Sequence, residues 1–107
     1  MQDEFISKIG VYGQIHYRYL KENKPSVVNV MRMKGTLRSY LEEINSDAEE
    51  RLARLETELV KNEGVTESLK RQDQMMWVSR MNSIRNRVEE VVIHELRLST
   101  RRRRKLR

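Results

Sequence analysis

The chain has 107 residues, of which 37% are hydrophobic and 36% charged, a balance that fits one folded domain with a thin core. It has no cysteine, which excludes disulfides and thiolate metal sites, and no apolar run approaching the roughly 20 residues of a membrane span. The first residues lack the charged-then-apolar order of a signal peptide, so we expect a cytoplasmic protein without membrane contact. Aromatic residues make up only 6%, which is typical of a helical protein.

The net charge of +6 comes from the last residues of the chain. Among the 22 basic residues, the 16 that precede residue 99 are matched by 16 acidic residues. We therefore predict a neutral helical domain over residues 1–98 and a flexible basic tail over residues 99–107. The cations of this tail are Arg101, Arg102, Arg103, Arg104, Lys105 and Arg107.

The first predicted helix runs from about Ile9 to Asn23, after a short or poorly ordered start. It ends before Pro25, because proline disfavours helical conformation in the residue that precedes it. Proline suits the first turn of a helix, so the second helix should begin there and run to about Met33, with Gly35 ending it. The side chains expected on its buried face are Val27, Val30 and Met31.

Residues 36–63 are predicted to form two helices. Thr36 can cap the first of them, and Asn45 can adopt the left-handed conformation that closes it. The sequence Ser46-Asp47-Ala48-Glu49 has the pattern of a capping box, in which the serine and glutamate side chains satisfy free amides at the start of a helix. A further helix should therefore begin at Ser46 and continue to Gly64.

The longest predicted element is one helix from Thr66, its expected N-cap, to Leu98. Its apolar side chains recur at spacings of four and three, which places them along one stripe. The stripe comprises Trp77, Met81, Ile84, Val88, Val91 and Leu98. Only Gly64 and Val65 separate this helix from the preceding one, and so short a connection forces an antiparallel hairpin over residues 46–98.

The two helices of this hairpin differ in length. At about 1.5 Å per residue, the first covers roughly 27 Å and the second about 50 Å, so residues 84–98 overhang their partner. Either the three N-terminal helices or a second chain in a homodimer must cover the apolar residues there, and we expect the N-terminal helices to do so. The predicted fold is a small all-α bundle in which three shorter helices cover a long hairpin. The residues to be covered are Ile84, Val88, Val91 and Val92.

The sequence offers few residues for catalysis or metal binding. Glu90 and His94 lie one helical turn apart, but no second histidine completes a zinc motif, and we interpret the two as an ion pair. His16 lies among apolar neighbours and is expected to be packed rather than to bind a ligand. With no nucleophile motif and no glycine-rich phosphate loop, we expect no enzymatic activity, no cofactor and no metal site. One aromatic and three methionine side chains lie close together in the sequence: Trp77, Met75, Met76 and Met81. Such residues at helical spacing are more typical of a core, and a binding surface is the alternative interpretation.

The basic tail is the strongest local sign of a function. Its six cations can neutralise phosphates of DNA without sequence preference. The alternative is that they complement the dipole of the preceding helix and improve solubility. Polar residues of the long helix are expected to serve structure or to bind a partner. They are Asp73, Arg80, Asn82, Arg85 and Arg87.

Several motifs resemble the TnpV family of transposon-encoded proteins. The resemblance runs from about Ile9 to Leu96 and does not include the basic tail. Its motifs are Tyr12-Gly13, Tyr19-Leu20-Lys21-Glu22, Lys34-Gly35-Thr36-Leu37, Gly64-Val65-Thr66-Glu67 and, from Asp73 to Arg85, DQM-x-WV-x-RMN-x-IR. It implies a small helical protein of a bacterial mobile element and supplies no catalytic residues. Two functions fit: an accessory protein that contacts DNA, and a helical module that binds the element's recombinase or a second copy of itself.

Overall fold

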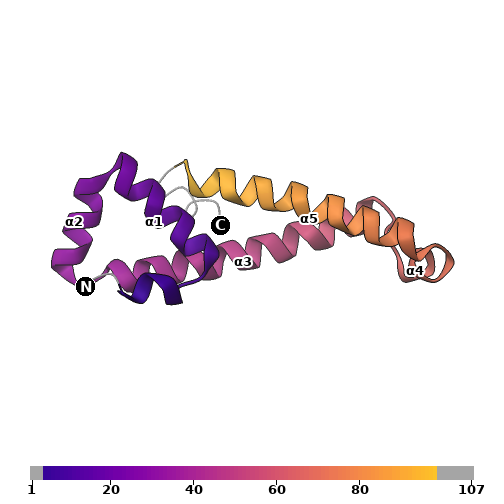
Figure 1. Cartoon of the computed structure of the whole chain (residues 1–107), viewed down its shortest axis with the longest axis horizontal. Coiled ribbons are helices and arrows are strands. Elements are labelled where there is room, and N and C mark those ends of the chain that lie inside the picture. The colour runs from indigo at the N-terminus through magenta and orange to yellow at the C-terminus, as the bar shows by residue number, and fades with distance from the viewer. Residues whose placement is uncertain (1–3, 99–107) are drawn as a thin grey trace. The chain divides into compact units, whose positions relative to one another are not determined.

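The computed structural model describes residues 4–98, and the regular structure in this range is entirely helical (Figure 1). The all-α class is thereby confirmed. Within these residues a short 3-10 helix precedes five α-helices. Their bounds are η1 Glu4–Lys8, α1 Val11–Asn23, α2 Pro25–Lys34, α3 Leu37–Asn62, α4 Glu67–Gln72 and α5 Gln74–Leu96. The predicted basic tail lies outside the described residues.

The chain divides into two compact units. Within the described residues, the first comprises residues 4–49 and 93–98, and the second comprises residues 50–92. Helices α3 and α5 each run from one unit into the other, because their bounds span both ranges. A single domain over residues 1–98 stays a prediction.

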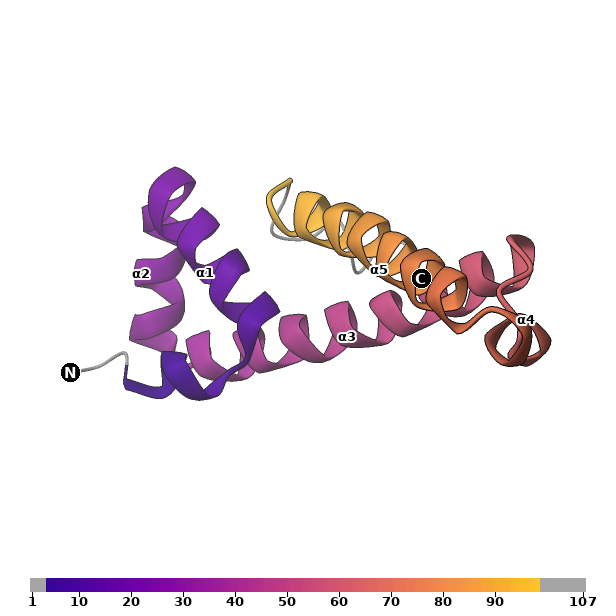
Figure 2. The same cartoon turned by 45° about the vertical axis from the view of Figure 1, so that its right-hand side comes forward.

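Helices α1 and α2 lie side by side in the first unit (Figures 1 and 2). Only Lys24 separates them, and α2 begins with Pro25 as its first residue, as predicted. Gly35 ends α2 in the left-handed conformation, with φ 73° and ψ 22°. Pro25 and Gly35 therefore determine the two ends of α2, and both ends can be predicted from the sequence.

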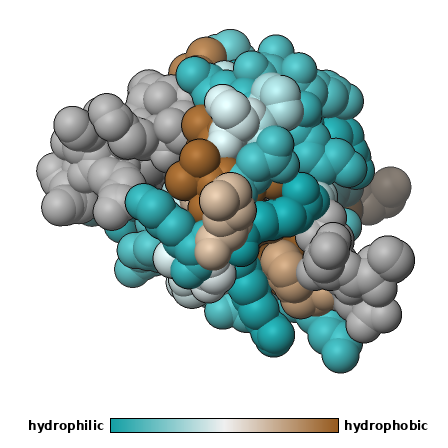
Figure 3. Space-filling model, turned by 90° about the vertical axis from the view of Figure 1, so that its left-hand side faces the viewer, coloured by the Kyte–Doolittle hydropathy of each residue, from teal (hydrophilic) through white to brown (hydrophobic). Residues whose placement is uncertain are grey.

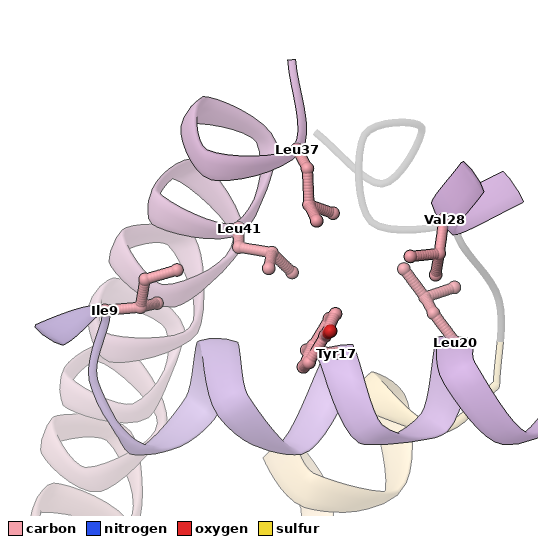
Figure 4. Packing of buried hydrophobic residues seen from close by; sticks show 6 residues of the cluster. All are labelled: Ile9, Tyr17, Leu20, Val28, Leu37 and Leu41. Carbon is pink, nitrogen blue, oxygen red and sulfur yellow. The ribbon is translucent and has the colours of Figure 1, made fainter. Parts of the chain in front are cut away.

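The core of the first unit gathers side chains from α1, α2, α3 and the segment before α1 (Figure 4). It comprises Ile9, Tyr17, Leu20, Val28, Leu37 and Leu41. The prediction for α2 is wrong for Val30, which is exposed, and it omits Val28, which is 2% exposed. Val27 is partly buried, and Met31, also partly buried, packs against the core. Apolar side chains occur all round this short helix, so its own spacing does not identify the inward face.

One uninterrupted helix, α3, replaces the two helices predicted between residues 36 and 63. The predicted end at Asn45 is wrong, because its side chain bonds to another helix instead of closing its own. Asn45 Oδ1 accepts hydrogen bonds of 3.0 Å from the backbone N–H groups of Tyr12 and Gly13. Amides in the first turn of a helix have no intrahelical acceptor. Asn45 thus caps α1 from α3, and Ser46 is an exposed residue within a continuous helix.

Two glycines allow α1 to approach Asn45 this closely. A Cβ added to Gly10, whose φ is +118°, would lie 2.6 Å from both terminal atoms of the Asn45 side chain. A Cβ on Gly13 would lie 3.0 Å from the Leu41 carbonyl oxygen and would collide with the Ile9 side chain. These glycines weaken the start of α1 by propensity, but the contact with α3 requires them.

The long helix predicted from Thr66 to Leu98 is two helices, α4 and α5. The prediction fails at Asp73, whose backbone leaves the helical region at φ −151° and ψ 86°. Asp73 Oδ1 accepts a hydrogen bond of 3.1 Å from the Met76 N–H and so caps α5. Thr66 caps α4 through the Leu69 N–H, as expected. No glycine or proline marks the break, and the aspartate is its only signal in the sequence.

In the second unit α5 runs antiparallel to the second half of α3 (Figures 1 and 2). The hairpin expected from the short connection is present within residues 50–92. The core residues are Val65, Met81, Ile84 and Val88, and the partly buried ones around them are Leu52, Leu55, Leu59, Val60, Leu69 and Trp77. Ile84 and Val88 therefore pack against α3 and do not overhang it. Only residues 93–96 of α5, with Arg97 and Leu98 after it, belong to the first unit with the N-terminal helices.

The apolar stripe of α5 shifts along the helix. Val91 and Leu98 are exposed, whereas Val92 and Leu96 are buried. A strict repeat of four and three averages 3.5 residues per turn, while a straight helix has 3.6, so the inward face drifts by about 20° per heptad. After Val88 the buried positions are therefore 92 and 96, each one residue later than the strict repeat predicts.

Candidate functional site

The end of α5 is fixed to α1 within the first unit. His16 is fully buried, and its Nδ1 lies 2.7 Å from the carbonyl oxygen of Leu96. Its Nε2 lies 2.8 Å from the hydroxyl of Tyr40. A carbonyl oxygen only accepts, so Nδ1 carries a proton, and in the neutral ring Nε2 accepts from Tyr40. The Tyr19 hydroxyl also donates to the Leu98 carbonyl at 3.2 Å. Side chains of α1 thus bind two backbone carbonyl groups at the end of the described chain, those of Leu96 and Leu98.

In the sequence, the basic tail follows the residues that this attachment holds. Its cations, from Arg101 to Arg107, lie outside the described residues, whereas Leu98 is the last residue that the structure describes.

An open hollow of about 230 Å³ lies in the first unit, where α1 meets the end of α5. Its lining residues are Ile15, Arg18, Tyr19, Glu22, Asn23 and Arg97. Two guanidinium groups against one carboxylate make the hollow positive. Guanidinium groups bind phosphate oxygens well, so this surface suits an anionic group better than an apolar ligand.

Three of the five polar residues expected to serve structure or a partner have separate surroundings in the second unit. Asp73 is structural, since it caps α5. Arg80 and Asn82 are exposed, and within residues 4–98 no side-chain hydrogen bond or ion pair engages either of them. They are not brought together with Asp73 in one site. A role for Arg80 and Asn82 in partner binding stays a prediction.

The other two, Arg85 and Arg87, are paired with carboxylates. Arg85 Nε lies 3.2 Å from Glu56 on α3. Arg87 donates two hydrogen bonds, of 2.8 and 3.0 Å, to the Glu63 carboxylate just after α3. These pairs tie α5 to its hairpin partner, and they reduce the positive charge that either arginine presents to a polyanion.

The Arg87 pair predicts a pH-dependent part of the stability. The hydrogen bond from Arg87 is the main cause that lowers the pKa of Glu63, against a smaller effect of desolvation. A carboxylate with a lower pKa in the folded chain stabilises the fold above its unfolded pKa of about 4.3, and the stabilisation is lost as the pH falls through the folded pKa. By urea unfolding, the stability difference between wild type and Glu63→Gln should therefore shrink from about pH 6 to about pH 3.

Glu58 supplies the control, because it is exposed and no ion pair engages it in the described part of the chain. The stability difference between wild type and Glu58→Gln should change little over the same pH range. Identical pH profiles for the two variants would contradict the assignment of the pair.

Several smaller predictions are corrected by the structure. Glu90 and His94 are both exposed, and no ion pair joins them within residues 4–98. Trp77 and Met81 join the core, but Met75 and Met76 are exposed because α5 begins at Gln74 and they fall in its first turn.

Over residues 4–98, His, Cys, Asp and Glu side chains nowhere gather in a group of three or more that could hold a metal ion. Among the described helices, none combines the length and the hydrophobicity that crossing a membrane requires.

The sequence reasoning missed the attachment of α5 to α1. A histidine among apolar neighbours signals a buried polar group that must find partners. Those partners, Leu96 and Tyr40, lie 80 and 24 residues away from His16, where no local pattern connects them.

The comparisons with known proteins agree with the motifs in the sequence. A family model described as "Transposon-encoded protein TnpV" matches residues 1–96, which includes the segment before Ile9. The six tail cations follow the matched residues. Neither the curated proteins nor the solved structures gave a match. The chain belongs to the TnpV family of transposon-encoded proteins.

Proposed function

We propose that this chain is a non-enzymatic accessory protein of a bacterial mobile element and that it contacts DNA without sequence preference. The cations that make the contact are Arg101, Arg102, Arg103, Arg104, Lys105 and Arg107. The mobile element follows from the family. The observation that carries the DNA contact is the attachment of the end of α5 to α1, through His16 and Tyr19, at the base of a segment with six cations.

A cationic segment binds DNA by neutralising phosphates and releasing condensed counterions. This gives affinity without recognition of bases, together with a steep dependence on salt. The tail is joined to the folded unit by a short stretch of sequence, because Arg101 comes three residues after Leu98, which Tyr19 of α1 holds. The same unit carries the positive hollow that contains Arg18 and Arg97. The folded unit is therefore held close to the backbone once the tail binds.

Duplex binding tests the proposal in the full chain. The variant replaces all six tail cations by glutamine, and both proteins are titrated with unrelated duplexes over a series of salt concentrations. Each phosphate contact contributes about 0.9 to the magnitude of the log-log salt slope, so the variant should lose up to about 5 from that slope. Its melting temperature should stay near that of the wild type, because the replaced residues follow the helices. An unchanged slope in the variant would contradict the proposal.

A second function is favoured by one exposed surface at the start of α5. Met75 is 82% exposed, and Met76 and Val78 are also exposed. Flexible methionine side chains adapt to different partners, and such a patch suits a helical interaction module that binds a recombinase or a second copy. Analytical ultracentrifugation of the purified chain measures its self-association and so distinguishes the interaction module from the DNA-contacting protein. Self-association that persists at high salt and disappears in Met75→Gln/Val78→Gln would support the interaction module.

A further inference from the structure

The equal numbers of basic and acidic residues before the tail conceal an uneven distribution. Residues 5–41 contain seven basic residues and a single acidic one, Glu22. Residues 42–50 contain five acidic residues and no basic one. Within the first unit, α1 and α2 are therefore basic, while the following part of α3 is acidic.

Tyr17 contacts one cation from each of the two basic helices. Its ring is part of the core and only 6% exposed. Lys21 Nζ lies 5.0 Å from the centroid of this ring, and Arg32 of α2 donates a hydrogen bond of 2.7 Å to its hydroxyl. Arg18 lies three residues before Lys21 and so on the same side of α1. Lys24 forms the connection between the helices. Arg18, Lys21, Lys24 and Arg32 are called the α1–α2 cation surface below.

Three of the four cations of this surface, all but Arg32, are exposed to solvent. No ion pair engages Arg18, Lys21 or Lys24 within the described range 4–98. Arg38 at the start of α3 differs, since it pairs with Glu42 at 3.0 Å. Exposed cations that lie near one another create a field that attracts a polyanion.

We infer that the α1–α2 cation surface binds the phosphate backbone of duplex nucleic acid, a role that rests on the proposed DNA contact and extends it to the folded part. The surface reaches the residues that precede the tail in the sequence, because Arg18 shares the hollow with Arg97 and the neighbouring Tyr19 holds Leu98. A polyanion as long as a duplex engages both sets of cations at once. A short acidic peptide would contact only part of these cations.

The acidic residues of α3 bear on how the duplex approaches the chain, and the surface near α2 is mixed in hydropathy. Figure 3 views the chain from the side on which α2 lies in Figure 1, and hydrophilic residues surround a smaller apolar area there. The exposed apolar residues of α2 are Val30 and Met33. The five acidic residues of 42–50 repel phosphates, so the duplex approaches α1 and α2 rather than this part of α3.

The test compares two triple variants of the full chain that lose the same charge. One is Arg18→Gln/Lys21→Gln/Lys24→Gln. The control is Arg54→Gln/Lys61→Gln/Arg71→Gln, which replaces exposed cations of the second unit that have no ion pair within the described residues. At about 0.9 per phosphate contact, the first variant should lose up to about 2.7 from the magnitude of the duplex salt slope, and the control less than about 0.9. A charge-retaining variant, Arg18→Lys/Lys21→Arg/Lys24→Arg, should bind like the wild type.

The tail variant, measured in parallel, separates this inference from the proposed function. Equal slopes for the two triple variants, with a large loss in the tail variant, would overturn the α1–α2 surface and leave the tail contact standing. Absence of duplex binding by the wild type at low salt would overturn both. If the first variant lost binding to poly-glutamate but kept duplex binding, an acidic protein would be the partner and the inference would be wrong. Circular dichroism verifies that each variant remains helical.

Discussion

Replacing Ile84 with aspartate is expected to unfold the hairpin of α3 and α5. Ile84 is 0% exposed and lies in the core of the second unit with Met81, Val88 and Val65. An unpaired carboxylate there costs several kcal/mol, against a total stability of about 5 to 15 kcal/mol for a domain of this kind. Thermal melting followed by circular dichroism should show loss of the cooperative transition or a large drop in its midpoint.

The neighbouring residue provides the control for this variant. Ser83 is exposed on the same helix, so Ser83→Asp adds the same charge without burying it. It should melt within a few degrees of the wild type. A cooperative, near-wild-type melt of the Ile84 variant would mean that another face of α5 is turned inward.

Replacing Asn45 with alanine is expected to remove about 2 to 4 kcal/mol of stability, because two amides of α1 lose their acceptor. These amides, of Tyr12 and Gly13, have no partner within their own helix. Asn45→Asp keeps an acceptor oxygen beside the positive end of α1 and should lose much less. Urea unfolding of the variants measures the difference.

The neighbouring Ser46 distinguishes this account from the capping-box prediction. In a continuous α3 the exposed Ser46 caps nothing, so Ser46→Ala should be neutral or slightly stabilising. If a new helix began there, the same change would cost about 1 kcal/mol and Asn45→Ala would cost little. The order of the two losses therefore decides which residue is the cap.

The sequence predicts several helix ends that depend on the chemistry of a single residue, although it does not predict the break at Asp73. Pro25 and Gly35 bound α2 and Thr66 caps α4, as expected. Prediction from the sequence fails at Asn45, where a tertiary contact competes with a local pattern. Continuing α3 through Asn45 keeps the backbone hydrogen bonds of the helix and frees the side chain to cap α1, which outweighs a local capping box.

The candidate site is less predictable than the fold for a related reason. Lys21 and Arg32 lie on different helices and meet only through Tyr17, so no spacing in the sequence joins them. Counting charges over the whole body averages the basic α1 and α2 with the acidic part of α3. A count over residues 5–41 alone reveals the excess of seven basic residues over one acidic residue.

The most direct test of nucleic-acid contact is a titration of the isotope-labelled full chain with a short duplex of unrelated sequence, followed by NMR. We expect salt-sensitive shifts of the amide signals in two stretches, residues 17–25 and residues 101–107. Signals of residues 54–61 should stay unchanged and serve as the internal reference. Shifts confined to residues 80–87, or a spectrum unaffected by the duplex at low salt, would contradict this expectation.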